Sequence, residues 1–122
     1  FQDARAYGAT ILSARQIRAM GAQKVLEQLP QGGRYYVTID IDAFDYSIAG
    51  GTGSPMLGGL LYDEAVDLLE GIAQLGEVIC VDLVEVSPPY DDAAGTPCYL
   101  AARILADFLG FITKERERRG ER

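Results

Sequence analysis

The chain has 122 residues, of which 48% are hydrophobic and 24% are charged, and its formal net charge is −7. These values indicate a single globular domain at most, because a chain of this length supports one core. The negative charge disfavours nucleic acid and anionic membranes as partners and favours cations, either metal ions or organic ones. No apolar run is long enough to span a bilayer and no signal peptide opens the chain, so we expect a cytoplasmic protein without membrane contact.

The first third of the chain predicts a short strand followed by a helix. Residues 9–12 form an apolar strand candidate. Ser13 and Gln16 have the spacing of a capping box, which predicts that a helix begins there. The buried side of this helix consists of apolar residues at helical spacing: Ile17, Met20, Val25, Leu26 and Leu29. The turn residues 30–33 end it.

The stretch 34–40 predicts a buried strand of a parallel sheet, because it is an apolar, β-branched run bounded by turn residues. Asp40 and Asp42 close this strand. Alternate residues of a strand project to the same face, so we expect both carboxylates to point together into the space beyond it. Neighbouring carboxylates resist burial unless a cation, a shared proton or a basic partner lies close. A hard divalent metal is the simplest answer.

The middle of the chain predicts a loop, a helix and a second strand. The loop covers residues 43–61, and its Gly-Thr-Gly run is too regular for a flexible linker. Apolar residues at helical spacing predict a helix over 62–75, which a glycine ends. The run 78–86 is almost wholly apolar and predicts another buried parallel strand. It carries Asp82 and Glu85, and the two prolines that follow forbid further pairing.

The end of the chain predicts one more helix and a tail. Thr96 as N-cap and Pro97 in the first turn mark the start of the helix. It is apolar nearly all round over residues 98–112, so we expect it to be buried. On this basis residues 1–113 form the globular part, and residues 114–122 form a solvated charged tail.

Two further features limit the chemistry. The chain contains no histidine and does not begin with methionine, so we expect a piece of a longer sequence in which any imidazole comes from elsewhere. Cys80 and Cys98 lack the spacing of a zinc site or a redox motif, and both lie in apolar patterns. We therefore expect free, buried thiols.

The predicted order β-α-β-α-β-α indicates an α/β fold, with a parallel sheet, right-handed crossovers and helices against the faces of the sheet. Strands 34–40 and 78–86 would run the same way. Asp40, Asp42 and Glu85 would then emerge together at the carboxyl edge, where open α/β sheets bind their ligands. Three acids are expected to converge on one crevice there.

Each of these features also has a simpler interpretation. An Asp at a strand end often only caps a turn, and Glu85 could pair with Arg34 or Arg103. Asp82 is more simply a satisfied buried acid than a catalytic one. The Gly-Thr-Gly of residues 51–53 lacks the lysine of a phosphate-binding loop, and the nearby carboxylates would repel phosphate. A receiver domain or a haloacid-dehalogenase-type phosphatase fits the strand-end acids but needs a lysine at a later strand end, which the sequence lacks.

Three motifs follow one another at a suitable spacing. They are Val37-Thr38-Ile39-Asp40-Ile41-Asp42-Ala43-Phe44-Asp45, then Gly51-Thr52-Gly53-Ser54-Pro55 with Gly58-Gly59, then Asp82-Leu83-Val84-Glu85-Val86 with Pro88. Together they closely resemble the C-terminal portion of the ureohydrolases, the family of arginase and agmatinase. The resemblance runs from about Ser13 to Ile112. Phe44 and the ending at residues 108–112 look most like the agmatinase and guanidinobutyrase branch.

The resemblance implies a three-layer α-β-α fold with a parallel sheet, of which this chain holds only the C-terminal part. It implies a hydrolase with a binuclear manganese (Mn²⁺) centre that splits a guanidino compound, such as agmatine, and releases urea. Asp40 would bridge both metal ions, Asp42 would bind one of them, and Glu85 would accept hydrogen bonds from the guanidinium of the substrate. Such enzymes act in polyamine metabolism and are usually trimers or hexamers.

The sequence also departs from the pattern of this family. The remaining metal ligands of the family, a His and an Asp-x-His-x-Asp cluster, belong to the preceding half and do not occur here. We therefore expect the chain to carry part of an active site and to be inactive by itself. Tyr46 and Gly50 stand where the family has prolines, and Leu61 replaces the usual Ser or Thr helix cap. A second hypothesis is a non-catalytic binding or assembly subunit that keeps the ureohydrolase scaffold.

Overall fold

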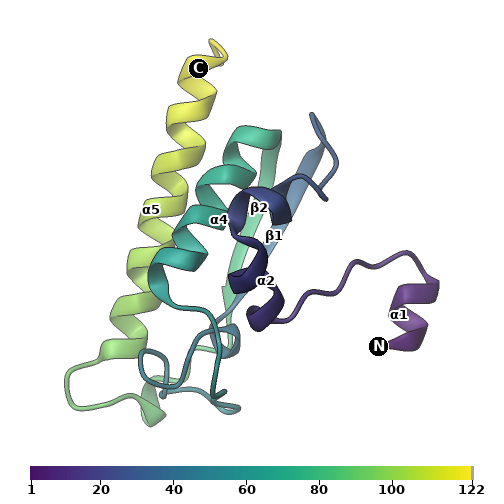
Figure 1. Cartoon of the computed structure of the whole chain (residues 1–122). Helices are drawn as coiled ribbons and strands as arrows, with labels where there is room; N and C mark the ends of the chain where they lie inside the picture. The colour runs from purple at the N-terminus through teal and green to yellow at the C-terminus, as the bar shows by residue number, and fades with distance from the viewer. Residues whose placement is uncertain (122) are drawn as a thin grey trace.

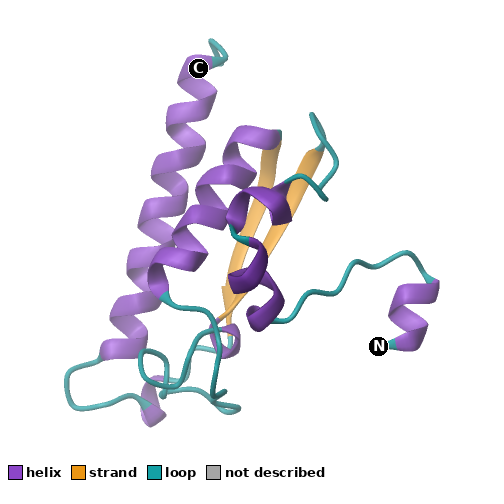
Figure 2. Cartoon of the chain, viewed as in Figure 1, coloured by secondary structure: helices purple, strands orange, loops and turns teal. Residues whose placement is uncertain are grey.

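The computed structural model describes residues 1–121 and places its main helices against one face of a small parallel sheet (Figures 1 and 2). The elements, including two short 3₁₀ turns labelled η, are α1 (Gln2–Ala6), α2 (Ala14–Met20), α3 (Ala22–Leu26), β1 (Arg34–Asp40), η1 (Ile41–Ala43), α4 (Tyr62–Leu75), β2 (Glu77–Val84), η2 (Pro88–Tyr90) and α5 (Thr96–Arg118). The fold class is α/β with a parallel sheet, as predicted.

The sheet consists of β1 and β2, which run parallel and are connected through α4. Their register places Arg34 beside Glu77 and Asp40 beside Val84. One face of β1 packs on the core through Tyr35, Val37 and Ile39. On the other face Tyr36 is 59% exposed. The expectation of a strand buried on both faces is therefore wrong within residues 1–121, because helices cover only one side.

The core lies between the sheet and the pair α4 and α5, which run side by side (Figure 1). The largest fully buried side chains come from η1, the loop after it and α5: Ile41, Phe44, Ile104 and Phe108. Removing a large apolar side chain from water stabilises the fold by about 1.5–3 kcal/mol. Residues next to Asp40 and Asp42 are thus anchored in the core, which fixes the path of the chain at the carboxyl edge of the sheet.

The helix predicted after Ser13 forms, but as two segments. Its capping box is present: the Ser13 N–H donates to Gln16 Oε1 at 2.9 Å, and the Gln16 N–H donates to Ser13 Oγ at 3.3 Å. The helix breaks at Gly21, whose φ of 79° lies outside the helical region. Glycine adopts positive φ without steric cost, so the chain changes direction there between α2 and α3.

The strand predicted at residues 9–12 does not form. These residues have no regular structure and pair with neither β1 nor β2. An extended segment needs a neighbouring strand for its N–H and C=O groups, and residues 1–121 provide none beside it. The preceding α1 buries no residue and stands away from the body (Figure 1).

The last helix differs from its prediction at both ends. Gly95 is its N-cap and Thr96 its first residue, and it continues to Arg118 because Lys, Glu and Arg are good helix formers. The expectation that residues 114–122 form a solvated tail is wrong at Glu115, which is buried and pairs with Arg118 at 2.9 Å. The helix is also not buried all round, since Tyr99 is 69% exposed.

Two smaller expectations can be compared with the structure. Both cysteines are free thiols, but Cys80 is exposed and Cys98 is half-buried, so the prediction that both are buried is wrong. Cys80 lies on β2 next to the exposed ring of Tyr36, on the face of the sheet that no described helix covers. Within residues 1–121, no helix combines the length and the apolar character needed to cross a bilayer.

Candidate active site

The three predicted acids lie at the carboxyl edge of the sheet. β1 ends at Asp40, whose neighbour across the sheet is Val84, and Glu85 is the next residue along the chain. After Asp40 the chain turns into η1, so Asp42 is not a strand residue and strand alternation does not set its direction. Instead Asp40 Oδ1 accepts the backbone N–H of Asp42 at 2.9 Å, an interaction typical of Asp at tight turns.

Asp42 lies in a restricted environment. It is half-buried, and the hydroxyl of Thr52 donates a hydrogen bond to its Oδ1. Burial raises the pKa of the Asp42 carboxyl above its usual range, and the negative charge of Asp40 raises it further. The ionised form of Asp42 is therefore costly in the free protein, and a bound cation would stabilise it.

Thr52 is a site residue that sequence reasoning did not assign. Its side chain is 5% exposed, and its hydroxyl oxygen accepts the backbone N–H of Ser54 at 3.1 Å while the hydroxyl donates to Asp42. Ten residues separate it from Asp42 in the chain. In the sequence, only the Gly-Thr-Gly pattern pointed to this position, because that pattern is too regular for a flexible linker.

The glycine-rich loop is held by two side chains outside the candidate metal site. Asp45 accepts the Ser47 hydroxyl at 2.6 Å and the Gly58 N–H at 2.7 Å, and these bonds, the Ser47 hydroxyl first, lower the pKa of its carboxyl. Arg18 donates to Glu64 at 2.6 Å and to the carbonyl oxygen of Gly59 at 3.0 Å. The prediction that this loop is ordered agrees with these contacts.

A close backbone approach also fixes this loop. A Cβ atom at Gly59 would lie 2.4 Å from the carbonyl carbon of Phe44, so no larger residue fits there. Glu64 Oε2 accepts the N–H of Leu61 at 2.9 Å. This bond satisfies a backbone donor at the start of α4, although Leu61 offers no capping oxygen.

Glu85 differs from the other two acids. It is exposed, and its φ of 63° makes it the one non-glycine residue with positive φ in the described chain. Such a backbone conformation is strained for a residue with a Cβ and clusters at functional sites. Glu85 forms no salt bridge within residues 1–121, and Arg103 pairs instead with Asp107 at 2.9 Å. The simpler hypothesis of a Glu85–Arg103 pair is therefore wrong.

Asp82 does not reach the same edge. It pairs with Thr38 in the register, and the hydroxyl of Tyr36 donates to its Oδ2. The hydroxyls of Thr38 and Tyr36 lower the pKa of its carboxyl. Its Oδ1 is buried and has no hydrogen-bond partner among residues 1–121, so the interpretation as a satisfied acid holds for one oxygen only.

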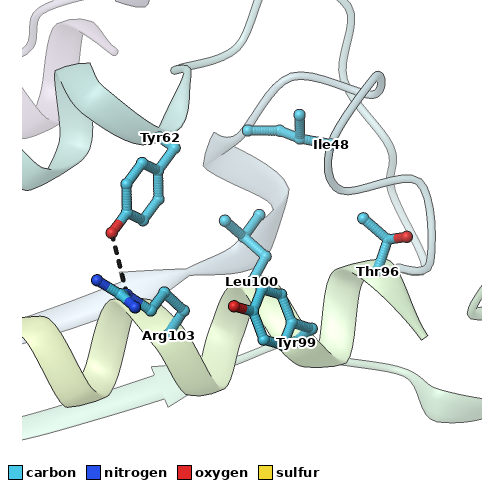
Figure 3. Close-up of a pocket in the computed structure, with 6 residues that line it drawn as sticks. All are labelled: Ile48, Tyr62, Thr96, Tyr99, Leu100 and Arg103. Carbon is cyan, nitrogen blue, oxygen red and sulfur yellow. Dashed lines mark hydrogen bonds between the residues drawn. The ribbon is translucent and has the colours of Figure 1, made fainter. Parts of the chain in front are cut away.

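Residues of the glycine-rich loop line several cavities, two of which differ in their relation to the candidate acids. One, of about 470 Å³, includes Asp42 in its lining. The other, of about 370 Å³, lies where the starts of α4 and α5 meet the loop, and Figure 3 shows Tyr62 and Arg103 facing each other at one end of it. Arg103 Nε donates to the Tyr62 hydroxyl there at 3.3 Å. None of the three candidate acids lines this second cavity, whereas Asp42 lines the first, and Asp40 lines a smaller cavity of about 190 Å³ between β1 and α4.

The residues present suit part of a metal site. Adjacent carboxylates are the oxygen ligands that hard divalent cations prefer, and the desolvated Asp42 would gain from a cation. However, no group of three His, Cys, Asp or Glu side chains lies close enough to hold a metal ion in residues 1–121. Asp40 and Asp42 therefore fit as two ligands of a larger set, and not as a complete site.

Comparison with known protein families identifies the family to which this chain belongs. The sequence profile of the arginase family matches residues 1–110. The chain belongs to the arginase family. An agmatinase of Salmonella paratyphi B is 40% identical over 102 residues, which cover 81% of this chain and 32% of that protein. The chain thus spans about a third of the length of the curated relatives it matches.

Solved structures of the arginase family share the fold. A hypothetical agmatinase from Burkholderia thailandensis superposes with a TM-score of 0.79 and 33% identity, over 93% of this chain and 36% of that one. Proclavaminate amidino hydrolase from Streptomyces clavuligerus gives a TM-score of 0.86 and 30% identity, over 94% and 40%. The expected arginase-like fold is confirmed, and this chain corresponds to part of it.

Replacing Thr52 tests whether it orients Asp42. Thr52→Val keeps the shape of the side chain but removes the donor to Asp42 Oδ1, so we expect the Mn²⁺ affinity of the natural polypeptide to fall by about tenfold to a hundredfold, the usual effect of losing an outer partner of a ligand. Thr52→Ser keeps the hydroxyl and should bind nearly as the wild type does. Calorimetry with MnCl₂ measures both. Equal affinities for Thr52→Val and the wild type would show that the hydrogen bond has no such role.

Proposed function

We propose that the natural polypeptide containing these residues is a manganese-dependent ureohydrolase that acts on a guanidino compound, and that this chain carries part of its active site. The observation that supports this most strongly is the placement of Asp40, Asp42 and Glu85 at one edge of the sheet in a member of the arginase family. The relatives described as agmatinases support a linear guanidino substrate.

In this proposal the acidic side chains have different roles. Asp40 and Asp42 hold manganese, with the Asp42 carboxylate oriented by Thr52. When bound, manganese would supply a water of lowered pKa as the nucleophile at neutral pH. Glu85 accepts hydrogen bonds from the planar guanidinium, a charge-assisted geometry that positions the guanidinium carbon. Overall, water adds to this carbon, one C–N bond breaks, and urea and an amine leave, with the proton passing to the amine nitrogen.

Urea release tests the proposal. The natural polypeptide, loaded with MnCl₂, should form urea from a guanidino compound and lose this activity in a chelator. The 122-residue chain alone should form none, since Asp40 and Asp42 are the only proposed ligands and no group of three ligands is found in residues 1–121. Manganese-loaded natural polypeptide that is inactive on every guanidino compound tested would favour the non-catalytic assembly subunit instead.

Further properties belong to the same proposal. We expect a homo-oligomer, either a trimer or a hexamer, and a cytoplasmic setting in polyamine metabolism. The net charge of −7 supports small cationic substrates in preference to nucleic acid or membranes as partners. The free thiols of Cys80 and Cys98 are compatible with a reducing compartment.

Replacing Glu85 separates substrate binding from metal binding. Glu85→Gln keeps the size of the side chain but removes its charge. We expect kcat/KM to fall by about tenfold to a hundredfold, since hydrogen bonds to charged groups contribute about 1.5–3 kcal/mol. Manganese content, measured on the same samples, should stay unchanged. Loss of metal in Glu85→Gln would show that Glu85 is a ligand and that these roles are wrongly divided.

A further inference from the structure

Another cavity lies where the glycine-rich loop meets the segment that leads into α5. Its volume is about 290 Å³, at the small end of the range for ligand sites. Tyr46 and Gly50 line it from the loop, and Tyr90, Asp92 and Thr96 line it from the other side. Among the described residues none of the three candidate acids lines it, so it is a different cavity from the one beside Asp42.

Two tyrosine rings in the lining of this cavity are open to solvent. Tyr46 is 54% exposed and Tyr90 is 68% exposed. The ring of Tyr46 lies against Gly50, where a Cβ atom would come within 3.2 Å of Tyr46 Cε2. Glycine at this position therefore leaves room for the ring. The face of a tyrosine ring attracts a cation that lies within about 6 Å of its centre.

Asp92 adds a negative charge to the lining. It is exposed, and its Oδ1 accepts the N–H of Ala94 at 2.9 Å and the N–H of Thr96 at 3.0 Å. The hydroxyl of Thr96, followed by its backbone N–H, lowers the pKa of the Asp92 carboxyl. Asp92 forms no salt bridge within residues 1–121, and no Lys or Arg of the described chain lines the cavity. Its charge is therefore not compensated by a basic side chain there.

The start of α5 does not turn this cavity into an anion site. The N–H of Thr96 already donates to Asp92, and the N–H of Cys98 donates to Asp91 Oδ2 at 3.0 Å. Pro97 between them has no N–H to offer. Two carboxylates also outweigh the positive end of a helix, which is equivalent to about half a charge. The cavity therefore favours a cation.

We propose that this cavity is a second ligand site, which binds a small alkylammonium ion against the rings of Tyr46 and Tyr90, with the carboxylate of Asp92 compensating its charge. A hard metal ion is a poor occupant, because Asp92 is the only acidic side chain of the described chain in the lining. An alkylated nitrogen suits the rings better, since aromatic side chains recognise quaternary ammonium groups in this way. The inference goes beyond the proposed function and does not depend on it.

The test compares choline with 3,3-dimethylbutan-1-ol, an alcohol of the same shape in which carbon replaces the charged nitrogen. Saturation-transfer NMR of the methyl signals measures the affinity of each compound for the natural polypeptide. We expect choline to bind at least about tenfold more tightly than the alcohol, because two rings and a carboxylate act on its charge. Sodium chloride should weaken the binding of choline and leave that of the alcohol unchanged.

Variants of the lining locate the bound choline. Asp92→Asn keeps an oxygen that can accept the N–H groups of Ala94 and Thr96 but removes the charge, so choline should bind about two- to fivefold more weakly. Tyr90→Leu should have an effect of similar size, and Tyr90→Phe, which keeps the ring, should have none. Tyr99→Leu is the matched control, because Tyr99 is 69% exposed on α5 and does not line this cavity.

The outcomes are distinct from those that test the proposed function. No binding of choline, or equal binding of choline and the alcohol, overturns the inference. Choline binding that neither Asp92→Asn nor Tyr90→Leu weakens also overturns it, because the ion would then lie elsewhere. Glu85→Gln should leave choline binding unchanged, and a loss in this variant would place choline at the carboxyl edge instead. A natural polypeptide that binds choline as expected but releases no urea keeps this inference and loses the proposed function.

Discussion

Asp40→Asn abolishes urea release by the natural polypeptide and removes tight manganese binding. We expect activity to fall by at least about a thousandfold, since bound metal contributes several kcal/mol of transition-state stabilisation and each 1.4 kcal/mol is about tenfold in rate. The fold should survive, because an Asn oxygen can still accept the N–H of Asp42 that Asp40 accepts at 2.9 Å. The change therefore removes charge and keeps the turn.

Metal content and urea release are measured together on each variant. Asp42→Asn should mainly weaken one metal site and so lower activity less than Asp40→Asn does. Asp67→Asn is the matched control, because Asp67 is exposed on α4 and lines neither the cavity beside Asp42 nor the one beside Asp40. Full manganese occupancy with near-normal turnover in Asp40→Asn contradicts the assignment of this residue.

Phe108→Ala lowers the free energy of unfolding of the chain by about 3–5 kcal/mol, the usual cost of emptying a buried aromatic position. Phe108 on α5 is 0% exposed and belongs to the cluster that joins α4, α5 and the sheet. The loss expected for Phe108→Ala is a large share of the total stability of a domain, which is about 5–15 kcal/mol.

The neighbouring Leu109 provides the control, because it is 55% exposed on the same helix. Leu109→Ala should cost less than about 1 kcal/mol. Circular dichroism during urea denaturation measures both variants. If Phe108→Ala is too unstable to fold, Phe108→Leu, which keeps most of the volume, gives the smaller loss expected for a filled site. Equal losses for the Phe108 and Leu109 variants would show that the core is misplaced.

Local patterns predicted the elements nearest the candidate site well. Strand 34–40 has the predicted bounds, because a β-branched run between turn residues has few alternatives. Helix α4 also spans the predicted residues, 62–75, since its apolar spacing and its glycine stop agree. The placement of Asp40 and Glu85 at one edge follows from these two elements and the parallel direction of β2.

What the sequence did not predict depends on contacts between distant residues. The strand expected at residues 9–12 fails because strand formation needs a neighbour and not only an apolar run. The bond from Thr52 to Asp42 and the bond from Arg18 to Glu64 join segments that only the fold brings together. The same holds for Glu115, whose burial no pattern within a run of charged residues indicates.

Residue-resolved manganese binding by the 122-residue chain tests the assignment of the metal site most directly. Mn²⁺ is paramagnetic and broadens the NMR signals of the nearest nuclei, so a titration of the ¹⁵N-labelled chain locates the ion even when binding is weak. We predict that the backbone signals of Asp40, Asp42, Thr52 and Glu85 broaden first. Broadening centred on exposed acids of α4 such as Asp63 and Asp67, with Asp40 and Asp42 unaffected, would contradict the assignment of the carboxyl edge as the metal site.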